Sequence, residues 1–134
     1  MAVWSGWLAT LAIVVAASIP IATYLRRGRR MPPSSSPIRV HVVLGLTTSA
    51  LAFLHTLLVL PALGSPAATG GGMIAIAPAG LAFVLLIAHA GLGLQLRNDK
   101  LKTRAKTRRS HAGTAVAIAI AVTIHVVALE QARR

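Results

Sequence analysis

Four long apolar stretches dominate this sequence and leave little of it for any other kind of structure. Each is long enough to cross a hydrocarbon layer of about 30 Å at about 1.5 Å per helical residue. In lipid every backbone polar group must be paired within its own segment, so such stretches are predicted to be α-helical. They cover residues 3–25, 38–60, 73–96 and 110–129. We therefore predict an all-α integral membrane four-helix bundle, with residues 1–134 forming a single transmembrane domain.

The composition agrees with a membrane protein and narrows its chemistry. Hydrophobic residues make up 55% of the chain and charged residues 12%, whereas about a quarter of the residues in a soluble domain are charged. The sequence has no cysteine, which excludes disulfides, thiolate metal sites and haem attached through a Cys-x-x-Cys-His motif. The two carboxylates, Asp99 and Glu130, lie outside or at the end of the predicted spans, which disfavours a proton-coupled exporter.

Lysine and arginine gather on one side of the predicted bundle. Twelve of the fourteen cations lie within residues 26–39 and 97–109, and the connection 61–72 has none. The positive-inside rule assigns the basic side to the cytoplasm, so both termini face outward. The charge pattern indicates a multi-pass protein of the cytoplasmic membrane, in contact with anionic lipid, and argues against a nucleic-acid partner.

The second and fourth stretches carry paired histidines at equal spacing. His41 and His55 are 14 residues apart, His111 and His125 are also 14 apart, and the two pairs are offset by 70 residues. Each half of the chain has a span, a basic connection and a span with two histidines. This order predicts two pseudo-repeated hairpins of the same orientation. The two histidine spans are then parallel.

A spacing of 14 residues places both rings of a span on one face of its helix. At about 100° and 1.5 Å per residue, the two rings are about 40° short of four full turns and about 21 Å apart along the axis. His41 is therefore level with His111 near the inner surface, and His55 with His125 near the outer one. Ionisable residues inside a membrane mark function by default. Two facing pairs at two depths predict two bis-histidine haem b groups.

A haem is flat and wide, so the helix faces between its ligands must carry little bulk. This face is open on the second span and less open on the fourth. On the second span this face carries Gly45, Thr48 and Ala52. On the fourth span it carries Ala115, Ile118 and Val122, with Gly113 beside His111. The second nitrogen of each ring needs a hydrogen-bond acceptor. We expect the carbonyl one helical turn back, or a hydroxyl such as that of Ser110 or Thr123, to fill this role.

Arginine and glycine flank the inner histidines, in the motifs RVHxxxG at 39–45 and RSHAG at 109–113. With the two His-x13-His spans, these motifs resemble the diheme cytochromes b: the respiratory cytochrome b, the ferric-reductase-like transmembrane domains and, more loosely, the ascorbate-reducible cytochromes b. The resemblance covers spans two to four. It implies transmembrane electron transfer through two haems, between redox partner proteins or quinone. Those families usually have six or more spans or a nucleotide-binding domain, so this chain is expected to need partners or a larger complex, or to form a homo-oligomer.

Three further residues are candidates for contact with the inner haem. Arg39 and Arg109 are placed to form charge-assisted hydrogen bonds with haem propionates. His89 lies about seven residues from the inner end of the third span, where it could contact a propionate, line a quinone pocket or replace His111 as a ligand. A histidine that only bridges two helices is an equally good interpretation of His89.

Two other functions fit parts of the pattern. A cofactor-free membrane anchor or assembly subunit would use its histidines only to bridge helices. A histidine-lined metal-ion conduit is weaker, because only apolar residues separate the two histidine levels. The sequence has no nucleophile–base–acid set, phosphate loop or nucleotide motif. We therefore expect an electron-transfer protein or oxidoreductase subunit with no catalytic domain of its own.

The parallel topology predicts which ligands share a haem. We expect His55→Ala and His125→Ala to perturb the same component of the reduced-minus-oxidised spectrum, because each removes a ligand of the outer haem. His41→Ala and His111→Ala should perturb the other component. A match between His55→Ala and His111→Ala would contradict the topology. If His111→Ala keeps the inner haem and His89→Ala loses it, the third span supplies the ligand.

Overall fold

The computed structural model describes residues 2–28, 31–63, 72–132 and 134. Within this part of the chain, 87% of the residues are helical and no strand forms. The elements are α1 (Ala2–Arg27), α2 (Ser36–Val59), the short 3₁₀ helix η1 (Leu60–Ala62), α4 (Gly72–Gln95) and α5 (Arg104–Ala132). The prediction of an all-α chain with four long apolar helices is confirmed.

All four α-helices are long and apolar enough to cross a membrane. Large apolar side chains such as Leu11, Val84 and Ile120 are exposed along the bundle, as expected where lipid replaces water. The helix α5 begins at Arg104, six residues before the predicted span. Lysine and arginine are good helix formers, so the helix extends into its basic flank. The fold is consistent with a multi-pass membrane protein.

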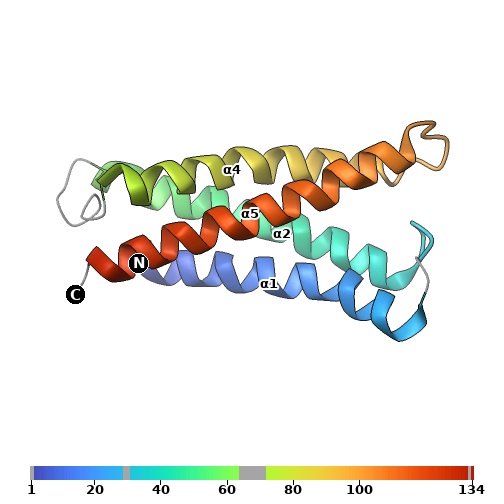
Figure 1. The fold of residues 1–134 in the computed structure, drawn as a ribbon, viewed down its shortest axis with the longest axis horizontal. Helices are drawn as coiled ribbons and strands as arrows, with labels where there is room; N and C mark the ends of the chain where they lie inside the picture. Colours follow the sequence, from blue (N-terminus) through green and yellow to red (C-terminus); the bar gives the residue numbers. More distant parts are fainter. Residues whose placement is uncertain (1, 29–30, 64–71, 133) are drawn as a thin grey trace.

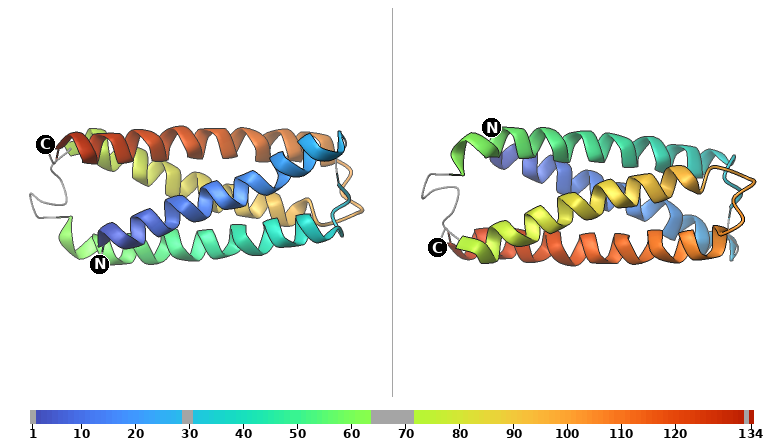
Figure 2. Two further views of the ribbon diagram at one scale, coloured as in Figure 1. Left: turned by 90° about the horizontal axis from the view of Figure 1, so that it is seen from below. Right: turned by 90° about the horizontal axis from the view of Figure 1, so that it is seen from above.

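The four helices form two antiparallel hairpins (Figure 1). The first hairpin packs α1 along α2, and the second packs α4 along α5. Across the bundle, α2 and α5 lie on opposite sides and run in the same direction, with α1 and α4 crossing between them (Figure 2). The helix α2 touches α4, whereas the backbones of α2 and α5 approach each other little. The two histidine helices are therefore parallel and held apart.

Prolines and a glycine shape the ends and interiors of the helices. Pro37 stands in the first turn of α2, where its missing N–H would have no helical partner. Gly28 follows α1 with a φ of 62°, a left-handed conformation that favours glycine, and its N–H donates to the Tyr24 carbonyl. Pro20 lies inside α1 and Pro78 inside α4. Each interior proline leaves the carbonyl four residues earlier without its helical donor.

The core between the helices is narrow and made mostly of small side chains. Two buried hydroxyls lie in it: that of Thr48 donates to the Leu44 carbonyl of α2, and that of Thr107 donates to the carbonyl of Thr103, the residue before α5. Small residues let helix backbones approach closely, which is typical of helices packed in lipid. Among the described residues, the buried apolar side chains are Ala9, Ala16, Ala75, Ala82, Leu86, Ile118 and Ala121.

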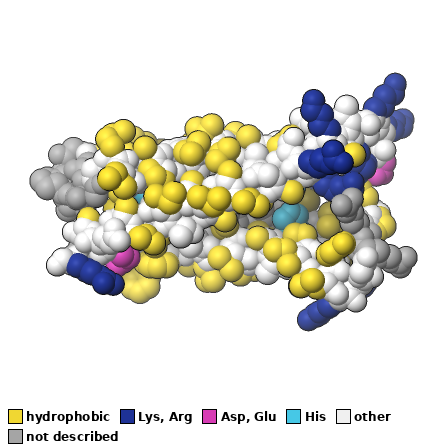
Figure 3. All heavy atoms as spheres, viewed as in Figure 1, with side chains coloured by type: hydrophobic (Ala, Val, Ile, Leu, Met, Phe, Trp, Pro, Cys, Tyr) yellow, Lys and Arg dark blue, Asp and Glu magenta, His cyan; other side chains and the backbone are white. Residues whose placement is uncertain are grey.

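Lysine and arginine side chains gather at the end of the bundle where α1 leads to α2 and α4 leads to α5 (Figure 3). Arg104 holds the connection between α4 and α5 in place through hydrogen bonds and an ion pair. Its guanidinium donates to the carbonyls of Leu96 and Asn98 and lies 3.7 Å from a carboxylate oxygen of Asp99. The two chain ends lie at the opposite end of the bundle. The fold thus keeps most of the positive charge on one side.

The contrast between Ile118 and Ile120 tests which face of α5 points inward. Ile118 is 3% exposed and Ile120 is 56% exposed. Ile118→Ala leaves a cavity and should lower the free energy of unfolding by about 2–5 kcal/mol. Ile120→Ala only changes a contact with lipid or detergent and should be nearly neutral. Thermal unfolding of both variants in the same detergent checks this, and equal shifts would contradict the assigned face.

Candidate functional site

Three histidines from three helices meet toward the basic end of the bundle. The ring centroids of His41, on α2, and His111, on α5, are 6.2 Å apart, and their planes are at 89°. His89, on α4, stacks against His111 with 3.7 Å between centroids and 17° between planes. The structure therefore brings the predicted inner pair together and places His89 directly beside it.

Hydrogen bonds from the ring nitrogens hold this cluster. His89 Nδ1 lies 3.0 Å from the carbonyl oxygen of His111 and 2.9 Å from Thr114 Oγ1. In return, His111 Nδ1 lies 3.1 Å from the carbonyl oxygen of His89. His41 Nδ1 lies 2.8 Å from the carbonyl oxygen of Ala16, on α1. A carbonyl can only accept, so all three Nδ1 atoms carry a proton and donate.

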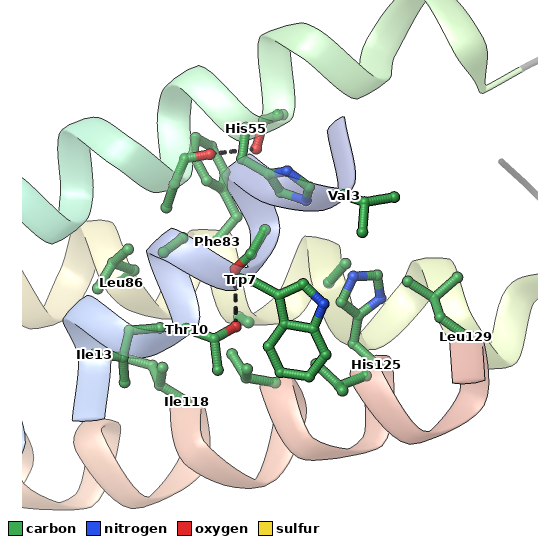
Figure 4. A pocket seen from close by; sticks show the side chains of 18 of the residues that line it. Val3, Trp7, Thr10, Ile13, His55, Phe83, Leu86, Ile118, His125 and Leu129 are labelled. Atoms are coloured by element: carbon green, nitrogen blue, oxygen red, sulfur yellow. Dashed lines mark hydrogen bonds between the residues drawn. The ribbon is translucent and has the colours of Figure 1, made fainter. Parts of the chain in front are cut away.

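His55 and His125 line one cavity toward the other end of the bundle (Figure 4). The cavity has a volume of about 150 Å³ and is partly open to the surroundings. The two rings point toward it from α2 and α5, and the indole of Trp7, on α1, lines it with them. Most of the remaining wall is apolar, from residues such as Phe83 and Leu86 of α4. The predicted outer pair thus shares one space.

The outer rings are also held by the preceding helix of their own hairpin. His125 Nδ1 donates to the carbonyl of Ala75, on α4, over 2.8 Å. His55 Nδ1 lies 3.0 Å from Ser5 Oγ, on α1, and this hydroxyl can pair with either tautomer of the ring. Both contacts join residues 50 positions apart. In neutral His125 the proton is on Nδ1, so Nε2 carries the lone pair.

The acceptors of the ring N–H groups lie on neighbouring helices, and the prediction of an acceptor on the same helix is wrong. The sequence suggested the carbonyl one turn back, or the hydroxyl of Ser110 or Thr123. The structure instead uses the carbonyls of Ala16, Ala75 and His89. A carbonyl oxygen has two lone pairs, so those of Ala75 and His89 can accept a ring N–H in addition to the backbone amide of their own helix. The Thr123 hydroxyl donates within its own helix instead.

Two glycines make room for histidine rings. A Cβ atom on Gly6 would lie 3.1 Å from Cε1 of His55, and one on Gly93 would lie 3.2 Å from Cε1 of His111. Both distances are shorter than an ordinary van der Waals contact. Gly6 and the acceptors Ser5, Ala16 and Ala75 were not identified from the sequence. Gly6 could have been found because it is a glycine within an apolar span, at the same depth in the bundle as His55.

The other predicted site residues fall into three groups. Thr48 is 2% exposed and lies midway between the two histidines of α2. Gly45 is half-buried, with no atom within 4 Å of the position of a Cβ, and Ala115 is also half-buried. Three of the predicted site residues line the outer cavity: Ala52, Ile118 and Val122. Three other predicted site residues are exposed: Gly113, Arg39 and Arg109.

Although three histidines meet at one level, within the described residues no three side chains of His, Cys, Asp or Glu form a group that could hold a metal ion. No known protein family, curated protein or solved structure matches this chain. The function is therefore inferred from the geometry of the histidines and from the fold that positions them.

Two glycines of α4 give a matched test of the seat for His111. Gly91 is exposed, with no atom within 4 Å of a Cβ, whereas a Cβ on Gly93 meets the His111 ring. Alanine is favoured over glycine in a helix by about 1 kcal/mol, so Gly91→Ala should keep or raise the thermal unfolding midpoint. Gly93→Ala should lower it, because His89 stacks on the His111 ring and restricts its movement. A Gly93→Ala variant as stable as Gly91→Ala would contradict this packing.

Proposed function

We propose that this protein is a small diheme b-type cytochrome that conducts electrons across a membrane, with His41 and His111 as ligands of an inner haem and His55 and His125 as ligands of an outer haem. One observation carries the proposal. In His41, His111 and His125, Nδ1–H donates to a backbone carbonyl of the neighbouring helix. Each neutral ring then presents the lone pair of Nε2. Iron- and zinc-ligating histidines are oriented by the same kind of hydrogen bond.

The distance within the inner pair would let both rings hold the same haem. A metal–imidazole bond is about 2 Å long, so two rings that share one metal ion must lie close together. The observed separation of His41 and His111 is 6.2 Å. His89, stacked on His111, limits the orientations that this ring can adopt.

The spacing of the helices also supports the proposal. The backbones of α2 and α5 stay apart although each carries two of the proposed ligands. At the outer level the space between them is the cavity lined by His55 and His125. At the inner level the position of a Cβ on Gly45, one turn after His41, has no neighbour within 4 Å. A flat macrocycle needs such room beside its ligands.

The charge distribution gives the proposed direction of the bundle. Most cations lie at the end where α2 and α5 begin, and the positive-inside rule assigns that end to the cytoplasm of a cytoplasmic membrane. His41 and His111 are then on the inner side, and both termini face outward. Arg39 and Arg109 are exposed near that level. They are placed to bind carboxylates such as haem propionates.

The chain itself would hold and orient the haems, and electrons would come from and go to partners. When bound, haem b supplies one-electron transfer. The sequence has no motif for nicotinamide or flavin, so the donor and acceptor are redox proteins or quinone. The protein then acts as an electron-transfer subunit, alone with soluble partners, as a homo-oligomer or within a larger complex.

One observation favours a second candidate, a cofactor-free membrane anchor or assembly subunit. The reciprocal hydrogen bonds of His89 and His111 fasten α4 to α5, and histidines that only bridge helices make such bonds. The two candidate functions predict a different visible spectrum for the purified protein. An anchor purifies colourless, and replacement of its histidines changes no visible spectrum.

The haem content of the purified protein tests the proposed function. We expect two haems b per chain, released by acid acetone because no cysteine holds them, and a reduced-minus-oxidised α-band typical of bis-histidine ligation. His125→Ala should lose about one of the two haems, since only the outer iron loses a ligand. Thr123→Ala, on an exposed residue of the same helix, is the matched control and should keep both. A colourless wild-type protein from haem-replete cells would overturn the proposal.

A further inference from the structure

Pro20 interrupts the backbone hydrogen bonds of α1 beside the contact between Ala16 and His41. In a regular helix the N–H of residue 20 would donate to the carbonyl of Ala16. Proline has no N–H, and its ring pushes against that carbonyl, which tilts away from the helix axis. The Ala16 oxygen is therefore left without its helical donor. Ala16 is 7% exposed, so the surroundings supply no water to replace that donor.

The His41 ring supplies the donor that Ala16 lacks. Its Nδ1 lies 2.8 Å from the Ala16 oxygen, a short distance for a hydrogen bond of this type. An unpaired carbonyl in an apolar environment is costly, and so is an unpaired ring N–H. One contact satisfies both groups, which makes the Nδ1–H tautomer of His41 strongly favoured over the alternative.

We propose that Pro20 is a positioning residue for His41: by removing the helical donor of Ala16, it reserves that carbonyl for the His41 ring and fixes Nε2 as the coordinating atom. The part of this proposal that concerns ligation rests on the proposed function, because it requires His41 to bind the inner haem. The part that concerns the hydrogen bond and the tautomer does not.

Pro78 of α4 provides a matched comparison. Its missing N–H leaves the carbonyl of Ile74 without a helical donor, whereas His125 bonds to the next carbonyl, that of Ala75, which keeps the N–H of Ala79 as its helical donor. Restoring an N–H at position 78 therefore adds no competitor at the Ala75 oxygen, and position 78 belongs to the other hairpin from His41. Pro78→Ala controls for the loss of an interior proline from an apolar helix.

The experiment compares wild type, Pro20→Ala and Pro78→Ala as purified membrane proteins labelled with ¹⁵N-histidine. The His41 ring signals are identified by their loss in His41→Ala. In wild type we expect a slowly exchanging Nδ1–H on His41. Pro20→Ala gives the Ala16 carbonyl a competing donor, so this proton should exchange roughly tenfold faster. Pro78→Ala should leave it unchanged. A His41 ring that is protonated on Nε2 in wild type overturns the proposal without any variant, even if Pro20→Ala fails to fold.

A second measurement follows the inner haem in reduced and oxidised protein. A hydrogen bond from Nδ1–H makes the ligand more basic, and losing an outer-shell partner weakens metal binding by about 10–100-fold. Pro20→Ala should therefore lose the inner haem more readily during dilution and raise its midpoint potential, while the outer haem stays as in wild type. Two haems with unchanged retention and potentials in Pro20→Ala would overturn the role of Pro20. A haem-free wild type would instead overturn the proposed function, and the proton-exchange result would still decide the hydrogen bond.

Discussion

The structure depends on the rule that a polar group in hydrocarbon must find its partner inside the protein. The backbone meets this rule by forming helices, whose carbonyls are then occupied by their own amides. The ring N–H of an interior histidine also needs an acceptor, and here it finds one on the neighbouring helix. His41 reaches Ala16 of α1, and His125 reaches Ala75 of α4. Each histidine helix is thus joined to the preceding helix of its hairpin by polar contacts as well as by apolar packing.

Small residues allow these contacts to form. Ala16 and Ala75 are buried, and their small side chains allow a histidine ring to reach the carbonyl of each residue. Gly6 and Gly93 lie so close to the rings of His55 and His111 that a methyl group would crowd them. Since lipid provides little hydrophobic drive between helices, close approach and hydrogen bonds do much of the work of association. The residues that give the site its shape are therefore mostly ones with no chemistry of their own.

Much of the architecture could be predicted from the sequence because lipid imposes long uniform spans and 14 residues nearly complete four helical turns. The same reasoning paired His41 with His111 and His55 with His125 in depth, and the structure places each pair across the bundle. The acceptors could not be predicted in this way. They depend on how far each helix is rotated and how closely it approaches its neighbour, which neither periodicity nor composition determines. Gly113 shows the same limit, since it neighbours His111 along the helix yet is exposed.

The two hairpins are well packed within themselves and only lightly joined to each other. Each hairpin can therefore complete its own hydrogen bonds soon after it enters the membrane, with its histidines already oriented by its first helix. Assembly is then the lateral association of two hairpins that are already folded. In a membrane, lateral pressure and bilayer thickness would act on the contact between the two hairpins.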